Sequence, residues 1–118
     1  MGLCAPEYDE VVRVLVDSGA DVNQRNRDHY TALYTATGLN NYDLVAYLLD
    51  SGADVNVACR GDRNWTPLHK AVANRNGGIA RLLVERGADL EARDADGRRP
   101  VDLVEVYGDS GMEGLLGR

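Results

Sequence analysis

The feature that most constrains this chain is a repeated heptapeptide. The letters DSGADVN occur at residues 17–23 and again at residues 50–56, 33 residues later. A weaker copy, ERGADLE, occupies residues 85–91, 35 residues after the second. Such a period is typical of proteins in which one small structural unit is stacked several times. The chain is therefore expected to be an array of units rather than a domain with one central core.

Each copy of the heptapeptide follows an apolar segment with helical spacing. These segments are VVRVLV from residue 11, LVAYLL from residue 44 and IARLLV from residue 79. In each segment the apolar positions gather on one face of a helix. The glycine of each GAD triplet (positions 19, 52 and 87) stands just past the helix end, where a left-handed residue is favoured. We therefore expect each helix to end at its glycine.

A second helix start follows about ten residues after each triplet. The three starts are YTALYTA from residue 30, WTPLHKA from residue 65 and RRPVDLV from residue 98. In the middle copy, the hydroxyl of Thr66 suits an N-cap, and Pro67 suits the first helical position, whose amide would be unpaired anyway. The residues just before the starts tolerate positive φ, which predicts tight turns; they are His29, Asn64 and Gly97.

The unit is thus a turn, a helix, a short loop and a second helix, and it has no core of its own. It resembles the ankyrin repeat in the TPLHKAV sequence that begins a helix at Thr66 and in the three GAD triplets that follow a helix end. The resemblance covers roughly residues 7–116 and implies an all-α ankyrin-repeat solenoid of stacked helix-turn-helix units with hairpin tips. Residues 1–118 then form a single domain, with a partial repeat at 1–25 and repeats at 26–57, 58–93 and 94–118.

Composition limits the partners and the compartment. The net charge of −6 opposes binding to nucleic acid or to anionic membranes. With 27% charged residues, no apolar run is long enough to span a bilayer, and the start MGLCAPEYDE lacks the pattern of a signal peptide. We expect a monomer in the cytoplasm or nucleus with Cys4 and Cys59 as free thiols. Because Phe is absent and Trp occurs once, the core is expected to be aliphatic.

Few residues are candidates for catalysis or metal binding: His29, His69, Cys59, and the pair Asp94 and Asp96. In the TPLH motif, the resemblance implies a structural histidine bonded to the helix-start threonine. The aspartate pair before Gly97 is typical of a tight turn, and a calcium loop needs more oxygen ligands. Cys59 is expected in a polar loop, with no histidine in a motif relation to it. The sequence therefore predicts no catalytic residue, no metal site and no cofactor.

The asparagines that end the two identical heptapeptides have two interpretations. In the structural one, Asn23 and Asn56 cap their own turns. In the alternative, they are hydroxylated, because asparaginyl hydroxylases that act on ankyrin repeats favour a leucine upstream, as at Leu15 and Leu48.

The resemblance implies that the array binds another protein through its concave face and its hairpin tips. The tip residues mapped in this way are Arg27, Asp28, Tyr30, Asp62, Arg63, Trp65, Asp96 and Arg98. The corresponding positions near the end of the first helix of each unit are Leu39, Asn74 and Tyr107. Tyr30, Trp65 and Arg98 occupy equivalent positions and are expected to form an exposed row of residue types enriched at interface hot spots. Replacing Trp65 by alanine is then expected to weaken binding with little loss of stability.

The charges of the tips favour an acidic partner. Residues 24–30, 57–65 and 91–99 hold seven basic and five acidic residues, whereas the rest of the chain holds six basic and 14 acidic residues. Arginines at the tips are suited to bind carboxylates in pairs of hydrogen bonds. Two interpretations follow: the partner carries an acidic protein segment, or the charged tips are only solvated.

Two other functions stay open. One alternative is that the chain is a targeting array trimmed from a larger multidomain enzyme, which the partial first repeat suggests. The chain also resembles the ankyrin inhibitors of cyclin-dependent kinases in GRRPVDLVEVYGD from Gly97, although YTALYTATGLN from Tyr30 departs from their degenerate second repeat.

Departures from the repeat predict uneven stability. Arg99 replaces the threonine cap in the last repeat, Gly77 and Gly78 are expected to weaken a helix, and Gly111, Gly114 and Gly117 predict fraying from about Asp109.

Overall fold

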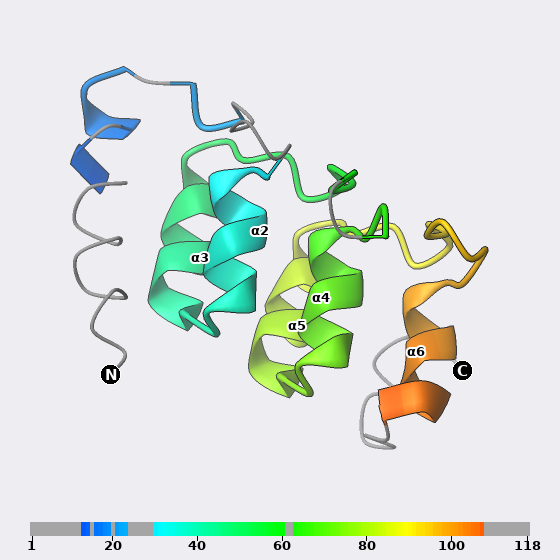
Figure 1. The fold of residues 1–118 in the computed structure, drawn as a ribbon. Coiled ribbons are helices and arrows are strands. Elements are labelled where there is room, and N and C mark those ends of the chain that lie inside the picture. The colour runs from blue at the N-terminus through cyan, green and yellow to red at the C-terminus, as the bar shows by residue number, and fades with distance from the viewer. Residues whose placement is uncertain (1–12, 15, 20, 24–29, 61–62, 108–118) are drawn as a thin grey trace.

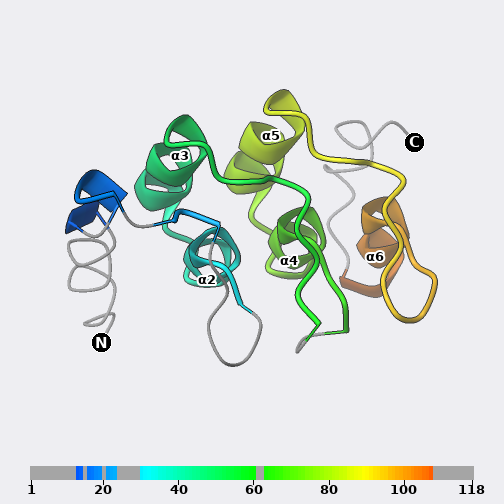
Figure 2. The same ribbon diagram turned by 90° about the horizontal axis from the view of Figure 1, so that it is seen from above.

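The helices lie in pairs that stack along one axis. The computed structural model describes residues 13–14, 16–19, 21–23, 30–60 and 63–107. The helices with defined bounds are α2 (Ala32–Gly38), α3 (Tyr42–Asp50), α4 (Pro67–Ala73), α5 (Gly77–Glu85) and α6 (Pro100–Tyr107), and the described residues 13–14 and 16–17 are also helical. Seen from above, α2, α4 and α6 form one row, here called the inner helices, and α3 and α5 form a second row, here called the outer helices (Figure 2). The prediction of an all-α solenoid of stacked helix pairs is confirmed (Figure 1).

The helices begin at capping residues that recur from one repeat to the next. Thr31 caps α2, since its hydroxyl accepts a hydrogen bond from the Tyr34 amide at 3.2 Å. Thr66 caps α4, with Pro67 in the first helical position, as predicted. Asn41 and Asn76 cap the outer helices α3 and α5 through their side-chain oxygens. Each cap satisfies an amide that the first helical turn leaves without a partner.

The helix ends use left-handed residues, as the glycines predict. After α3, Gly52 has a φ of 98°, and the Ala53 amide donates back to the Leu48 carbonyl at 2.9 Å. After α5, Gly87 has a φ of 95° and the same bonding recurs. This is the hydrogen-bond pattern of a Schellman C-cap. The inner helices α2 and α4 end in the same way at Asn40 and Arg75, which have φ values of 59° and 58°. These two positive φ values were not predicted from the sequence.

Gly77 and Gly78 weaken α5 less than their position in the repeat indicated. They are the first two residues of α5, directly after the Asn76 cap. The cost of glycine is largest in a helix interior, and the first turn is not an interior position.

The last described helix compensates for its missing threonine. Arg99 occupies the cap position before Pro100. The Asp102 carboxylate, three residues later, accepts hydrogen bonds from the Arg99 amide at 2.8 Å and from its guanidinium at 3.4 Å. One half of a capping box is therefore kept. The expected fraying from Asp109, with Gly111, Gly114 and Gly117, lies outside the described residues.

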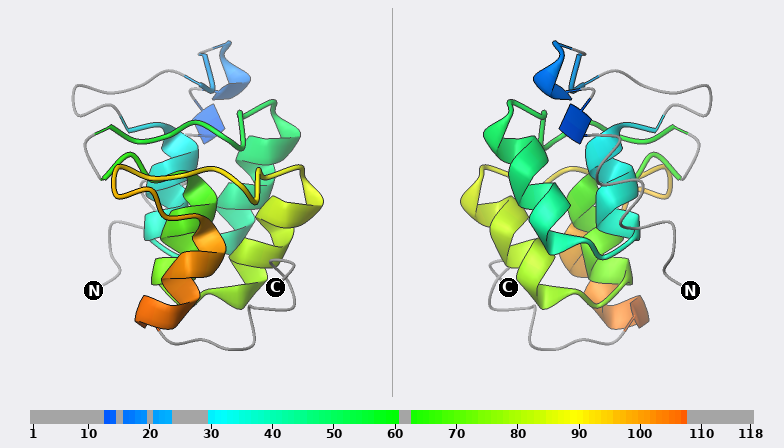
Figure 3. Two further views of the ribbon diagram at one scale, coloured as in Figure 1. Left: turned by 90° about the vertical axis from the view of Figure 1, so that its right-hand side faces the viewer. Right: turned by 90° about the vertical axis from the view of Figure 1, so that its left-hand side faces the viewer.

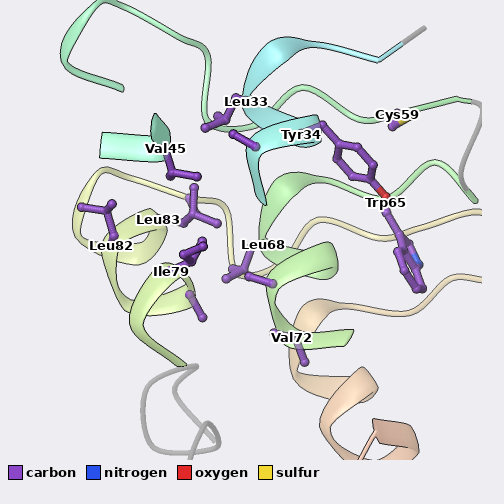
Figure 4. Close-up of a cluster of buried hydrophobic side chains, with 14 of the residues drawn as sticks. Leu33, Tyr34, Val45, Cys59, Trp65, Leu68, Val72, Ile79, Leu82 and Leu83 are labelled. Carbon is purple, nitrogen blue, oxygen red and sulfur yellow. The ribbon is translucent and has the colours of Figure 1, made fainter. Parts of the chain in front are cut away.

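The core runs continuously between the two rows and is not purely aliphatic. Leu33, Leu48, Leu68, Ile79 and Leu83 are fully buried, at 0% exposure. Tyr34 and Trp65 belong to the same cluster, at 3% and 5% exposure, on the side next to α2 and α4 (Figure 4). The prediction of an aliphatic core is therefore wrong at this end of the cluster, where two rings fill the space beneath the hairpins.

Two asparagines, the last residues of the two DSGADVN heptapeptides, join consecutive units. The Asn23 side chain accepts from the Asp54 amide at 2.6 Å and donates to the Gly52 carbonyl at 3.2 Å. Asn56 makes the equivalent bonds to Asp89 and Gly87 in the next unit. The expectation that these amides cap their own turns is wrong, because Asp21 and Asp54 do so instead. The asparagines are bridges between units.

Candidate functional site

The described parts of the hairpin tips project on the same side of the array as the inner helices (Figure 3). The hairpin of residues 94–98 projects on the side of the inner row, and the chain on either side of residues 61–62 does the same (Figure 3). Of the predicted binding residues, Leu39, Arg63, Asp96 and Arg98 are exposed, and Tyr30 and Asn74 are half-buried. Arg27, Asp28 and Asp62, and the side chain of Tyr107, lie outside the described residues.

The prediction that Trp65 is exposed at a tip is wrong. Its side chain is only 5% exposed, and its indole Nε1 donates to the Asp94 Oδ2 at 2.8 Å. The chain around it is held by an antiparallel bridge to Cys59, whose amide donates to the Trp65 carbonyl at 2.7 Å. Tyr30, Trp65 and Arg98 therefore do not form a row of three exposed side chains.

Asp94 is the centre of the last described hairpin. One carboxylate oxygen accepts from the amides of Asp96 and Arg98, and the other accepts from Trp65. The turn predicted from the aspartate pair is confirmed, and Gly97 supplies its positive φ of 78°. Burial raises the pKa of the Asp94 carboxyl, but these hydrogen bonds to its charged form outweigh burial and hold the pKa below its usual value. The buried charge thus fixes two neighbouring hairpins.

His69 has the structural role that was expected. Its Nδ1 accepts from the Thr66 amide at 3.2 Å and lies 2.8 Å from the Thr66 hydroxyl. Because Nδ1 accepts, the ring proton is on Nε2, which donates to the Arg98 carbonyl at 2.8 Å. The fully buried ring therefore links the start of α4 to the hairpin of the next unit.

The stability of the array is expected to fall between pH 7.5 and pH 5.5. Burial holds the pKa of His69 below its ordinary value of 6.5, against the opposing effects of the Arg98 carbonyl, Asp94 and Asp102. Below about pH 6.5 the unfolded chain binds more protons than the folded chain, so the contribution of His69 is complete above that pH and is lost below it. The limiting slope is about 1.4 kcal/mol per pH unit.

Urea unfolding at pH 7.5, 6.5 and 5.5 checks this, with His69→Gln as the comparison. The variant is expected to be less stable at pH 7.5 and to show a flatter pH profile. The lowered pKa of Asp94 acts only below about pH 4, where its contribution is lost as the carboxylate is protonated. Equal slopes for both proteins in this interval would show that His69 does not carry the pH dependence.

The structure contains an open pocket between α2 and α4 that was not predicted from the sequence. Its volume is about 240 Å³, and it is lined by Tyr30, Tyr34, Thr35, Gly38, Leu39 and Lys70. Two of these residues, Tyr30 and Leu39, were predicted as binding residues. Thr35 and Lys70 stand at equivalent positions, four residues after the helix-start threonines, but this shared polar position does not by itself indicate a pocket.

Asn74 has a structural role besides its predicted one. Its side-chain amide donates to the carbonyls of Thr37 and Gly38 at 3.4 Å and to Asn40 Oδ1 at 3.3 Å. It therefore ties the loop after α4 to the loop after α2. This arrangement places Asn74 beside Leu39 but leaves its amide engaged within the array.

The remaining candidates for chemistry are Cys59 and the metal-ligating side chains. Cys59 lies in the polar connection between α3 and α4 and is not in a disulfide, as predicted, but its thiol is buried at 1% exposure. Among the described residues, no group of three or more His, Cys, Asp or Glu side chains is arranged to hold a metal ion. Within the same residues, no helix is long and apolar enough to cross a membrane.

Comparison with known proteins finds the same repeat within much longer chains. Palmitoyltransferase Hip14 of Drosophila melanogaster is 42% identical over 95 residues, which are 79% of this chain and 15% of the relative. E3 ubiquitin-protein ligase KEG of Arabidopsis thaliana is 38% identical over 92 residues, 77% of this chain and 6% of the relative. Diacylglycerol kinase iota of Homo sapiens is 30% identical over 100 residues, 84% of this chain and 10% of the relative.

The chain thus spans between 6% and 15% of the length of these relatives. A family model described as ankyrin repeats in three copies matches residues 2–94. The match covers most of the chain. In the structure, the helix caps, the glycines that follow the outer helices and the asparagines that bridge units recur from one unit to the next. The chain belongs to the ankyrin-repeat family.

Proposed function

We propose that this array is a non-catalytic module that binds another protein through its concave face and hairpin tips. Ankyrin repeats are generally protein-interaction modules. The observation that carries the proposal is the open pocket between α2 and α4, beside which Leu39 leaves 42% of its side chain exposed. A large apolar side chain at the rim of a pocket is typical of a surface that a partner covers.

The proposed contact residues are those on the concave side of the array. They are Tyr30, Leu39, Arg63, Asn74, Asp96 and Arg98, together with Arg27, Asp28 and Asp62, which the structure does not describe, and Tyr107, whose side chain it does not describe. Trp65 acts indirectly, by holding its hairpin against Asp94. The partner is proposed to be a protein with an acidic segment, met by a monomer of this chain inside the cell.

A second candidate is that the array serves to position a larger enzyme. It is supported by the three relatives, each named as an enzyme, in which the matched region is a small part of the chain. An immunoblot of the native protein distinguishes the two. A band near 12.8 kDa would support a separate module, and a much larger band would support the enzyme.

The proposed function is tested by affinity capture from native extract with two matched double variants. Leu39→Asp with Arg98→Glu alters the concave side, and Tyr42→Asp with Arg81→Glu alters the outer helices α3 and α5. Each pair changes one exposed large hydrophobic residue and one exposed arginine. We expect wild type and the outer double variant to retain a common protein that the concave double variant loses by at least about tenfold, a loss of about 1.4 kcal/mol.

Circular dichroism shows whether both variants remain folded. If the outer double variant loses the partner and the concave one keeps it, the wrong face has been assigned. If all three proteins retain the same set, neither face binds a specific partner.

A further inference from the structure

The pocket between α2 and α4 has the size of a site for one side chain. Its volume of about 240 Å³ is below the roughly 300–1,000 Å³ of pockets that enclose small molecules. Its lining is more apolar than polar. The rings of Tyr30 and Tyr34, which are tilted by 36° with centroids 5.6 Å apart, form one wall, and the exposed Leu39 forms part of the rim. These dimensions fit an apolar side chain presented by a peptide.

Lys70 adds a positive charge at a defined place in this pocket. Its Nζ lies 5.8 Å from the ring centroids of both Tyr34 and Trp65, within the range of cation–π attraction. Two rings from neighbouring units therefore hold the ammonium group between them. An ammonium group also carries three N–H donors, which carboxylates accept strongly.

Gly38 makes room for the stem of Lys70. A Cβ at this position would lie 3.3 Å from Lys70 Cε, which is closer than ordinary van der Waals contact. The equivalent position in the next unit is Ala73, so the repeat itself does not require glycine here. Gly38 thus lets the stem of Lys70 lie directly against α2, at the edge of the apolar pocket.

The surrounding charges favour an acidic peptide over a nucleic acid. The chain as a whole is acidic, at a net charge of −6, whereas basic residues are concentrated in the tips. The interleaved carboxylates of Asp94 and Asp96 oppose a phosphate backbone along the tips. A single peptide carboxylate, unlike a phosphate backbone, needs to meet only the Lys70 ammonium group.

We infer that this pocket takes a partner's leucine, isoleucine, methionine or phenylalanine together with an aspartate or glutamate within two positions of it. The apolar side chain enters between Tyr30 and Leu39, and the carboxylate binds Lys70. This inference rests on the proposed function and specifies the partner's chemistry at that surface.

The test begins with selection of random 12-residue peptides displayed on phage against the folded chain. Selected peptides are then synthesised with amidated C-termini, and their affinities are measured by fluorescence anisotropy. We expect an apolar residue with a nearby acidic residue in the selected set. We also expect Lys70→Thr to weaken these peptides by at least tenfold. Thr35 occupies the equivalent position of the previous unit, so threonine is compatible with the fold there.

Charge reversal tests the contact itself. A peptide whose acidic residue is replaced by lysine is expected to lose binding to wild type and to regain it, at least in part, on Lys70→Glu. Arg81→Thr removes an exposed positive charge from the outer helix α5 and is expected to change affinity less than twofold. Amide chemical shifts of Thr35, Leu39 and Lys70 are expected to move most when the peptide is added.

The outcomes separate this inference from the proposed function. Peptides that bind Lys70→Thr as well as wild type, an empty selection, or binding of a 20-nucleotide single-stranded DNA that depends on Lys70 would each overturn the pocket assignment. If the concave double variant still loses its captured partner in those cases, the proposed function stands. If neither double variant affects capture, the proposed function fails.

Discussion

Trp65→Ala is expected to lower the free energy of unfolding by about 3–5 kcal/mol. The substitution removes a ring that is 5% exposed and leaves a cavity beneath the hairpins. It also takes away the indole N–H that bonds to Asp94, so a buried carboxylate oxygen loses its partner. Thermal and urea unfolding followed by circular dichroism measure the effect. Unfolding parameters equal to those of wild type would mean that the ring lies in solvent at the tip.

Two further variants separate the ring from its hydrogen bond. Trp65→Phe keeps most of the apolar surface and removes the N–H, so a loss of about 1–3 kcal/mol is expected from the unpaired Asp94 oxygen. Arg63→Ala removes an exposed guanidinium that lies 5.6 Å from the Trp65 ring centroid. Its expected cost is below about 1 kcal/mol. A larger loss from Arg63→Ala than from Trp65→Phe would contradict the assigned role of Asp94.

Leu48→Ala is expected to cost about 2–5 kcal/mol, the second large effect. Leu48 has no exposed surface, and its carbonyl accepts the hydrogen bond that ends α3. In a stacked array each unit is stabilised by its neighbours, so a cavity in α3 also weakens contacts to α5. Urea unfolding gives the change in midpoint and shows whether the transition remains cooperative.

Leu39→Ala is the matched control, because it makes the same substitution at a leucine that is 42% exposed. It is expected to change stability by no more than about 0.5 kcal/mol, as is usual for a surface position. Equal losses from both leucines would place Leu48 outside the core, against its burial.

The starts and ends of the helices could be predicted because they depend on a few neighbouring residues. The hydroxyl of Thr66 reaches an amide three residues away, and Gly52 and Gly87 adopt backbone angles that other residues disfavour. The same local logic predicted the turn around Asp94. Arg75, a left-handed residue with a side chain, could not be identified in this way, since its sequence neighbourhood carries no glycine signal at that position.

The candidate site could be predicted only in part. The resemblance placed Tyr30 at a hairpin tip and Leu39 near the end of a first helix, and the structure brings both together at one pocket. It did not identify Lys70, because the role of this residue depends on the rings of Tyr34 in one unit and Trp65 in another. The repeat boundaries after residues 25, 57 and 93 stay a prediction.

By itself, the sequence determined the period, the helix caps, the glycine exits and therefore the family of the fold. Only the tertiary structure decided which tip residues face solvent. Trp65 and Arg98 occupy equivalent positions, yet Trp65 finds the buried Asp94 carboxylate, while the side chain of Arg98 is exposed. Caps and exits arise from bonds across three to five residues, whereas the contact between Trp65 and Asp94 spans 29 residues and exists only after two units have stacked.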